Sequence, residues 1–470
     1  MNSLREPARQ IVERLHRAGF TAFWVGGCVR DFLLRLEPHD FDIATDARPE
    51  QVERLFERTI PVGRKFGVVI VLLQGRQFQV ATFRAEAEYR DGRHPEKIAF
   101  ANAEVDATRR DFTVNGLFFD PINQKLHDWV GGESDLRGKI IRTIGKAEER
   151  FGEDHLRMLR AVRFAARLNF TIEPNTLAAI QNLAPKIKAI SAERIRDELV
   201  KLFASPEAGS VGSPLPADPL QTDVGVHGAA RSTSPAARGL ILLRDSGLLE
   251  HVCPELAATI TCEQSPDFHP EGSVFNHLCL MLEQMPTAAP ELLPWAVLLH
   301  DIAKPVTAER DVATGKITFY GHERVGAEMA EKILLRLKFP NKQIEEIVAC
   351  VRHHMQFKDV KQMRKATLRR LLLRETFPLE LELHRLDCLG SSGRLEHYEF
   401  LLEQAEALKH SPAIQPPLLT GHDLIKLGIQ PGPALGALLA ELRERQLADE
   451  LVTAADALEW LKKQLPRHVR

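Results

Sequence analysis

Features that the sequence lacks narrow its class first. Its six cysteines are scattered and form no CxxC pair, which argues against a disulfide framework or a cysteine zinc site and fits a reducing compartment. No apolar run approaches membrane-spanning length, and the N-terminal MNSLREPARQ lacks the apolar segment of a signal peptide. The net charge is only −2, so any nucleic-acid contact must come from local basic patches. We therefore expect a cytoplasmic protein with no membrane-bound part.

The chain has 470 residues, more than one hydrophobic core usually serves, so several domains are expected. The N-terminal part mixes helix and strand patterns: a helix over 5–19, another from Val29, and strands over 68–73 and 78–83 joined by a turn through Gly75. Beyond about residue 150 the apolar spacing of three and four is almost entirely helical. These patterns predict an α+β head followed by helical domains.

Residues 205–235 interrupt the helical pattern. They are rich in Pro, Gly, Ser and Ala and short of large apolar side chains, so they cannot bury enough surface to offset the entropy of ordering. We expect a disordered insert here, and a catalytic loop is the alternative.

The first chemical signal is the segment HDFDIAT. Asp40 and Asp42 flank Phe41 in a predicted strand, where alternation places both carboxylates on one face and Phe41 on the other. Two adjacent carboxylates require a cation, and oxygen ligands beside phosphate suit Mg²⁺. The alternative is an acidic strand end exposed to solvent.

A phosphate cradle is predicted ten residues upstream. Gly26 and Gly27 let the backbone approach a phosphate closely, and the helix expected from Val29 offers free amide groups. Arg30, on the first turn of that helix, is placed to contact the phosphate. With this cradle beside it, the Asp-x-Asp pair favours a metal site over a solvated strand end.

Here the sequence resembles the class II nucleotidyltransferases, which comprise bacterial CCA-adding enzymes, their CC- and A-adding relatives, and bacterial poly(A) polymerases. The resemblance covers residues 10–260 apart from the insert. Four motifs occur in the family's order: GGCVRDFLL…HDFDIAT (26–45), RRDFTVNGLFFDP (109–121), EDHLRMLRAVRFAARLNF (153–170) and AISAERIRDEL (189–199). A nucleotidyltransferase head of the polymerase-β-like kind, with a small mixed sheet, is therefore implied.

The resemblance implies roles for individual residues. Asp40 and Asp42 would hold two Mg²⁺ ions that activate the primer 3′-hydroxyl and neutralise the triphosphate. The triphosphate would contact Gly27, Arg30 and Arg110. Alternatively, Arg109, Arg110 and Asp111 form a structural ion-pair cluster, and we expect this of Asp111.

Selection of the base is assigned to the third motif. Asp154 and Arg157 are three residues apart, so on a helix they share a face, where a carboxylate and a guanidinium match the Watson–Crick edge of C or A. The resemblance implies that they replace a nucleic-acid template. Arg160 and Arg163 continue the stripe and would hold phosphate or sugar. The alternative is an ordinary salt bridge on a surface helix.

One position departs from the family pattern. The family's third acidic group usually lies on the strand before the TFR segment, where this chain has Gln79. Three explanations stay open: Glu86 or Glu88 substitutes, the alignment is shifted, or two carboxylates suffice.

A basic region follows the head. Residues 137–201 carry 14 Lys and Arg and 8 Asp and Glu, a balance of 14 − 8 = +6. Such an excess fits the phosphates of a tRNA acceptor stem, recognised by shape and backbone.

The second half resembles HD-domain metal phosphohydrolases. Histidines and aspartates recur in the order H…HD…D with further histidines between, and Lys304 follows the HD pair. Imidazole and carboxylate ligands suit Mn²⁺, Fe²⁺, Ni²⁺ or Mg²⁺. The expected ligands are His277, His300, Asp301, His322, His353 and Asp387.

The HD part is expected either to remove 2′,3′-cyclic phosphates or 3′-phosphates from damaged RNA ends, or to be a fold without activity; activity is slightly favoured.

The whole chain is expected to add CMP and AMP, or part of CCA, to tRNA from CTP and ATP. Alternatives are poly(A) addition, an HD phosphohydrolase whose first half binds RNA, and a non-catalytic RNA-binding module. Sequence alone does not choose between CCA, CC, A and poly(A), nor give the oligomeric state.

The expected division is head 1–137, helical neck 138–204, disordered insert 205–238, helical body segment 239–265, HD domain 266–395 and helical tail 396–470.

Overall fold

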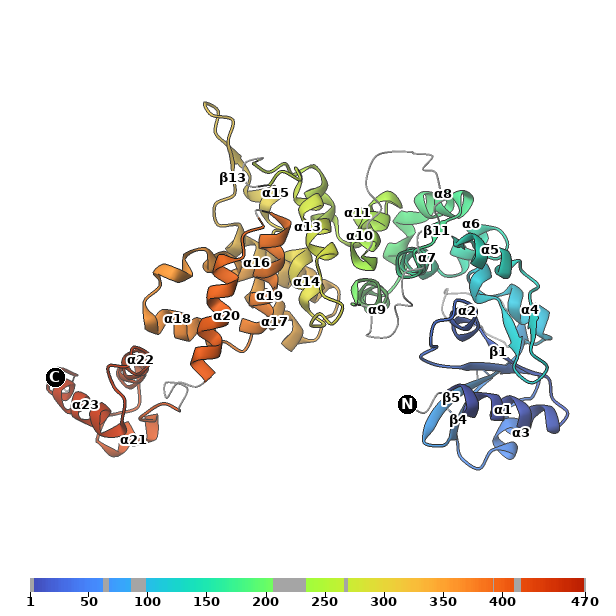
Figure 1. Cartoon of the computed structure of the whole chain (residues 1–470), viewed down its shortest axis with the longest axis horizontal. Helices are drawn as coiled ribbons and strands as arrows, with labels where there is room; N and C mark the ends of the chain where they lie inside the picture. Colours follow the sequence, from blue (N-terminus) through green and yellow to red (C-terminus); the bar gives the residue numbers. More distant parts are fainter. Residues whose placement is uncertain are drawn as a thin grey trace. The chain divides into compact units, whose positions relative to one another are not determined.

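The computed structural model describes residues 4–61, 67–85, 99–205, 234–265, 269–391, 393–409 and 416–468. The chain divides into two compact units (Figure 1). Unit 1 comprises residues 1–260, 285–294 and 333–339, and unit 2 comprises 261–284, 295–332 and 340–470. The predicted insert lies largely outside the described residues, as do Glu86 and Glu88.

Unit 1 begins with a seven-stranded mixed sheet. In spatial order its strands are β3 (Thr59–Ile60), β4 (Val68–Leu73), β5 (Arg76–Thr82), β2 (Asp42–Thr45), β1 (Ala22–Val25), β8 (Phe118–Asp120) and β9 (Lys125–His127). Only β2 and β5 pair in parallel, and the other neighbours are antiparallel. A small mixed sheet was expected, and it is confirmed.

The β4–β5 hairpin shows how the local sequence sets this sheet. Gln74 and Gly75 form a two-residue turn with φ of 51° and 73°, and Leu73 pairs with Arg76 across it. Positive φ at both positions matches the twist of the flanking strands, and glycine adopts it without strain. The turn and the strand predicted over 68–73 are confirmed, and the second strand begins two residues before the predicted 78–83 and ends one residue earlier.

Helices cover the sheet. Helix α1 (Arg5–Arg17) buries Ile11, Val12 and Leu15 and ends before Gly19, whose φ is 84°. In Figure 1, α1 and α3 (Pro49–Leu55) lie side by side along the sheet. Helix α2 begins two residues before the predicted Val29. The other head elements are α2 (Gly27–Leu33), β6 (Arg84–Ala85), β7 (Ala99–Phe100), α4 (Ala103–Thr108), η2 (Thr113–Asn115) and α5 (Gly132–Gly138).

The rest of unit 1 is nearly all helical. Helix α7 packs against both α9 and α10. Gly239 permits the close approach of α9 and α10, because a Cβ there would lie 2.6 Å from Leu202. The elements are β10 (Ile140–Ile141), α6 (Ala147–Glu153), α7 (Leu156–Leu168), β11 (Thr171–Ile172), α8 (Pro174–Leu183), η3 (Ala184–Ala189), α9 (Ala192–Phe203), α10 (Pro235–Asp245), α11 (Leu249–Val252), α12 (Pro254–Ala257) and η4 (Ala258–Thr261).

The described part of unit 2 is helical apart from one short hairpin. One buried cluster packs around Phe357, Leu371 and Leu401, and a second, near the C-terminus, packs around Leu424 and Leu438. The elements are α13 (Val274–Glu283), α14 (Leu293–Leu299), α15 (Lys304–Thr307), β12 (Glu309–Arg310), β13 (Ile317–Thr318), α16 (His322–Arg336), α17 (Asn341–His353), η5 (His354–Gln362), α18 (Lys365–Leu372), α19 (Phe377–Gly390), α20 (Glu396–Lys409), α21 (Gly421–Lys426), α22 (Pro433–Leu447) and α23 (Ala454–His468).

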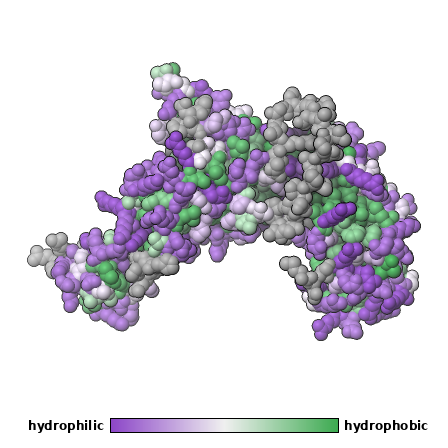
Figure 2. All heavy atoms as spheres, viewed as in Figure 1, coloured by the Kyte–Doolittle hydropathy of each residue, from purple (hydrophilic) through white to green (hydrophobic). Residues whose placement is uncertain are grey.

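The α+β class is confirmed: a mixed-sheet head is followed by predominantly helical parts. On the face shown in Figure 2, hydrophilic residues cover most of the coloured surface, with hydrophobic residues in smaller patches. Among the described helices, none combines the length and apolar character needed to cross a membrane.

Candidate active site and metal centre

Asp40 and Asp42 lie at the start of β2. The strand begins at Asp42, which pairs with Val25 of β1, and Asp40 precedes it with Phe41 buried between the two acids. Burial and then repulsion from Asp40 raise the pKa of Asp42 to about 6, although Arg110 lowers it. Within the described residues, neither carboxylate forms a side-chain hydrogen bond or ion pair. Two unpaired, mutually repelling carboxylates fit a divalent cation with oxygen ligands.

Gly26 allows Arg110 to lie against the backbone beside this pair. Gly26 has a φ of 76°, and a Cβ added there would lie 2.9 Å from Nη1 of Arg110. Arg110 is held by an ion pair to Asp106 at 3.2 Å and lies over the ring of Phe118. Its Nε atom is buried without a hydrogen-bond partner among the described residues. Arg110 is therefore positioned near the two acids while keeping a donor unsatisfied.

Arg30 belongs to a buried polar network. Its guanidinium pairs with Asp31 at 2.7 Å and donates to Oδ1 of Asn115 at 2.8 Å. Asn115 in turn donates to Asp111, and Arg160 pairs with the other oxygen of Asp111 at 2.7 Å. Asp111 is therefore an ion-pair residue, as expected. Arg109, like Arg110, pairs with Asp106 and not with Asp111.

The helical placement of Asp154 and Arg157 was wrong. Helix α6 ends at Glu153 and α7 begins at Leu156, so Asp154 lies at an extended junction between them, with φ −150° and ψ 104°. The two side chains do not pair with each other. Arg157 pairs with Glu153, and Asp154 accepts a hydrogen bond from Arg194 of α9 at 2.7 Å.

Arg160 and Arg163 meet on Glu198 of α9. Nε of Arg163 donates to Glu198 at 2.6 Å, and Nη1 of Arg160 lies 3.7 Å from the other oxygen. Arg194 and Glu198 lie in the fourth motif, but their contacts with Asp154, Arg160 and Arg163 were not predicted. Local sequence rules do not say which helix packs across α7.

Gln79 occupies the strand position beside Asp42. Strands β2 and β5 run parallel, and Ile43 pairs with Val80. Asp42 and Gln79 are the residues that precede this pair on the two strands. Gln79 is exposed at this position. The neutral amide therefore stands where the third carboxylate was expected.

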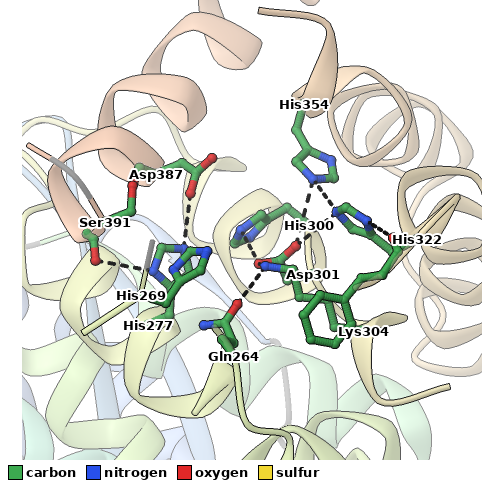
Figure 3. A network of polar contacts seen from close by, with 12 residues as sticks. Gln264, His269, His277, His300, Asp301, Lys304, His322, His354, Asp387 and Ser391 are labelled. Carbon is green, nitrogen blue, oxygen red and sulfur yellow. Dashed lines mark hydrogen bonds and ion pairs between the residues drawn. The ribbon is translucent and has the colours of Figure 1, made fainter. Parts of the chain in front are cut away.

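The HD part holds a second cluster, in unit 2. Three buried histidines each direct Nδ1 to a backbone carbonyl: His300 to Val297 at 2.8 Å, His322 to Phe319 at 2.7 Å and His354 to Val351 at 2.6 Å. Donation from Nδ1 leaves the lone pair on Nε2. The three Nε2 atoms lie 3.1, 3.4 and 3.8 Å from the Asp301 carboxylate. Figure 3 shows these side chains converging.

This cluster could hold a metal ion. Nε2 of His322 and Nε2 of His354 face each other at 3.1 Å. Nε2 of His300 is buried 3.1 Å from Asp301, and among the described residues it forms no hydrogen bond of good geometry. Burial, with His300 beside it, lowers the pKa of His354 to about 3, so this ring is neutral. Lone pairs facing a carboxylate are the donor set of a divalent transition metal.

Asp301 is common to two ligand sets. One oxygen lies nearest His322 and His354, and the other faces His300 and the ammonium of Lys304, at 2.7 Å. Two groups with metal-ligand spacing share this carboxylate: His277–His300–Asp301 and Asp301–His322–His354. Burial raises the pKa of Asp301, but His300 and Lys304 outweigh it and hold the pKa well below its usual range.

His277 lies between two carboxylates. Its Nε2 is 3.1 Å from Asp387 and its Nδ1 is 2.9 Å from Glu271. Burial lowers the pKa of this ring, but the bonds to Asp387 and Glu271 outweigh it and raise the pKa to about 10. Asp387, one of the expected ligands, therefore lies against His277 at the edge of the cluster. Glu271 is a further acid beside His277, and the sequence did not predict it.

The assignment of His353 was wrong. Its Nδ1 bonds to Glu380 at 3.0 Å, away from the cluster, and His354 lies in the cluster instead. The chain leaves α17 between the two histidines, so the exit of one helix decides which ring faces inward. The pair VRHHMQF alone did not distinguish them.

Comparison with known proteins agrees with this geometry. Residues 22–142 match the model of the poly A polymerase head domain, and 169–211 match the "probable RNA and SrmB- binding site of polymerase A". Residues 273–389 match the HD domain. The A-adding tRNA nucleotidyltransferase of Deinococcus radiodurans is 33% identical over 454 residues, 93% of this chain and 94% of the relative. The chain belongs to the tRNA nucleotidyltransferase family.

Other members of the tRNA nucleotidyltransferase family match over shorter spans. The CCA-adding enzyme of Staphylococcus haemolyticus is 45% identical over 197 residues, 42% of this chain, and the match spans about half of that relative's length (49%). Among solved structures, the Bacillus stearothermophilus CCA-adding enzyme in complex with CTP has a TM-score of 0.68 at 26% identity, covering 99% of this chain and 100% of the other.

Proposed function

We propose that this chain adds AMP, alone or after CMP, to the 3′ end of tRNA and releases pyrophosphate. The observation that carries the proposal is the unpaired Asp40–Asp42 pair, with Arg110 close enough to lower the pKa of Asp42. A carboxylate pair next to a buried arginine provides ligands for a cation and a contact for a triphosphate. Family membership supports this proposal because the full-length relative is named an A-adding enzyme.

The head residues divide the work of phosphoryl transfer. Asp40 and Asp42 would hold Mg²⁺, which when bound lowers the charge of the triphosphate and favours loss of the proton from the RNA 3′-hydroxyl. Gly27 leaves room for phosphate beside the backbone. Arg30 and Arg110 would contact the phosphates. Because their ion pairs with Asp31 and Asp106 already hold the two side chains, binding would cost little conformational entropy.

Base selection is assigned to Asp154 and Arg157. Each is held by another charged group, Asp154 by Arg194 and Arg157 by Glu153, so their orientations are fixed before the nucleotide enters. A carboxylate oxygen and guanidinium N–H groups match the donor and acceptor of C or A and do not match G or U equally well. Arg160 and Arg163, meeting on Glu198, would contribute phosphate or sugar contacts.

The partner is expected to be tRNA. Residues 137–201 have a charge balance of 14 − 8 = +6, which suits an RNA backbone. Structures of relatives are described as complexes with tRNA, ATP and CTP. The six free cysteines fit a cytoplasmic location.

Transfer of AMP is the step shared by the names "A-adding" and "CCA-adding", so it is the minimal activity proposed. The test supplies tRNA lacking one, two or three terminal nucleotides with labelled ATP or CTP separately. We expect AMP on tRNA ending in CC; CMP on the shorter substrates extends the activity to CCA. Long AMP tails on complete tRNA would replace the proposal with poly(A) addition, and no incorporation would overturn it.

A second activity is favoured by the convergent Nε2 lone pairs around Asp301. A divalent transition metal fits these ligands, and such a site hydrolyses phosphate esters by activating water. We propose that unit 2 removes 2′,3′-cyclic phosphate or 3′-phosphate from RNA ends. Incubating the full chain with Mn²⁺ and RNA bearing each end would release inorganic phosphate or open the cyclic ester; no change in either RNA would overturn this second activity.

A further inference from the structure

His277 is the member of the HD cluster with an acid on each side. The ring is fully buried, and both nitrogens are engaged: Nε2 lies 3.1 Å from Asp387 and Nδ1 lies 2.9 Å from Glu271 (Figure 3 shows Asp387 and His277). Glu271 is itself almost buried, with 7% of its side chain exposed. The ring therefore does not face solvent, and each nitrogen has a carboxylate beside it.

His269, Glu271 and His277 have the spacing of a metal site. This set conflicts with the set His277–His300–Asp301, because a neutral imidazole has one lone pair. In this structure Nε2 donates to Asp387, so coordination toward Asp301 requires Nε2 to lose that proton. The remaining proton then stays on Nδ1, which lies 2.9 Å from Glu271 and can donate to it. The second set shares Asp301 with the set Asp301–His322–His354, so it belongs to a larger group of converging ligands, and we assign the His277 lone pair to that group.

We infer that Glu271 is a positioning residue: its carboxylate accepts the Nδ1 proton of His277, fixing the tautomer and the ring orientation that present Nε2 to a divalent metal at Asp301. The inference rests on the proposed HD metal centre. The other three histidines achieve the same orientation through backbone carbonyls. Nδ1 of His277 also forms a hydrogen bond to the carbonyl of Gly390 at 3.3 Å, so Glu271, which is closer and charged, shares this proton with a backbone acceptor.

The negative charge of Glu271 affects the metal affinity of His277 as well as the orientation of its ring. A carboxylate bonded to the outer nitrogen makes imidazole a stronger ligand, and losing such a partner typically lowers metal affinity roughly 10- to 100-fold. Glu271 uses one oxygen, Oε1, for both His277 and His269, and its Oε2 is buried with no hydrogen-bond partner among the residues that the structure describes. Glu271 thus joins the loop before α13 to the metal ligand on α13.

The test measures Mn²⁺ binding by the electron paramagnetic resonance signal of free Mn²⁺. The full-length chain carries Asp40→Ala and Asp42→Ala, so that the head carboxylates do not contribute. Adding Glu271→Ala is expected to raise the Kd for Mn²⁺ roughly 10- to 100-fold, and Glu271→Gln, which keeps an acceptor but no charge, roughly 3- to 10-fold. Glu263→Ala is the matched control, because that carboxylate is exposed and pairs with Arg310.

The outcomes separate the two proposals. If the parent binds Mn²⁺ and both Glu271 variants bind it equally tightly, the role of Glu271 is overturned while the metal centre stands. If the parent does not bind Mn²⁺, the metal centre fails and the inference fails with it. Circular dichroism shows whether Glu271→Ala folds; if it does not, the isosteric Glu271→Gln decides, and an unchanged Kd in that variant overturns the inference.

Discussion

Asp154 accepts a side-chain hydrogen bond from Arg194, at 2.7 Å, and not from Arg157 three residues further along the chain; its other oxygen accepts from the backbone N–H of Leu156. The carboxylate that the third motif assigns to base selection is thus held by a residue of the fourth motif. Helix α9 packs against α7, which brings Arg194 to the junction where Asp154 lies. Orientation of Asp154, the acid proposed to select the base, therefore depends on the packing of two helices.

Removing this restraint should loosen selection of the nucleotide. Arg194→Ala is expected to lower kcat/KM for CTP or ATP about tenfold and to narrow the preference over UTP and GTP, because Asp154 loses a charge-assisted hydrogen bond. Arg194→Lys should recover part of the preference. Lys201→Ala, an exposed cation on the same helix, is the control. Unchanged selectivity in a folded Arg194→Ala variant would show that Asp154 needs no partner.

The metal assignment in the head is tested by Asp42→Ala. We expect loss of labelled-nucleotide incorporation into tRNA, since Asp40 alone leaves a cation with one protein carboxylate. Asp46→Asn, at the other end of the same strand segment, keeps its acceptor oxygen for Thr21 and should retain activity. Activity in Asp42→Ala at saturating Mg²⁺ would disprove the assignment.

The two units should be separable by mutation. Asp301→Ala removes the carboxylate shared by both HD ligand sets, so phosphatase or phosphodiesterase activity should disappear while nucleotide addition remains. Both activities are measured on the same preparation, with tRNA ending in CC and with RNA ending in a cyclic phosphate. Loss of both would mean that the units do not act independently.

Gly132 and Gly152 of unit 1 allow a controlled comparison of the effect of an added methyl group on the free energy of unfolding. A Cβ on Gly132 would lie 2.1 Å from the backbone oxygen of Thr113, whereas one on Gly152 meets nothing within 4 Å. Gly132→Ala should therefore destabilise unit 1 by about 2 kcal/mol or more. Gly152→Ala, within α6, should be neutral or stabilise by up to about 1 kcal/mol. Urea unfolding followed by circular dichroism measures both; equal stabilities would contradict the packing around η2.

The ion pair of Asp111 and Arg160 predicts a pH effect on stability. Burial raises the pKa of Asp111, but Arg160 and Asn115 outweigh it, so the pKa is lowered overall. A lowered pKa means that the pair stabilises the fold above the unfolded value, about 3.9, and that this contribution is lost as pH falls below it. The unfolding free energy of the wild type should exceed that of Asp111→Asn by a constant amount from pH 7 to pH 5. The difference should shrink below about pH 4, and a difference that shrinks above pH 5 would contradict the lowered pKa.

Short-range chemistry made much of the head predictable. The Gln74–Gly75 turn, the strands beside it and the end of α1 at Gly19 follow from backbone preferences of the residues themselves. The Asp40–Phe41–Asp42 alternation likewise predicted which residue is buried. The start of α2 was missed by two residues because glycine at a helix start gives no strong signal.

The sequence by itself determined which acids and histidines are available, their order, and the α+β class of the fold. Tertiary structure decided which of them meet: His354 enters the HD cluster in place of His353, Arg194 holds Asp154, and Glu271 reaches His277. Local periodicity describes one element at a time, whereas these contacts depend on where one helix ends and which neighbour crosses it. That information lies in the packing of elements distant in the sequence.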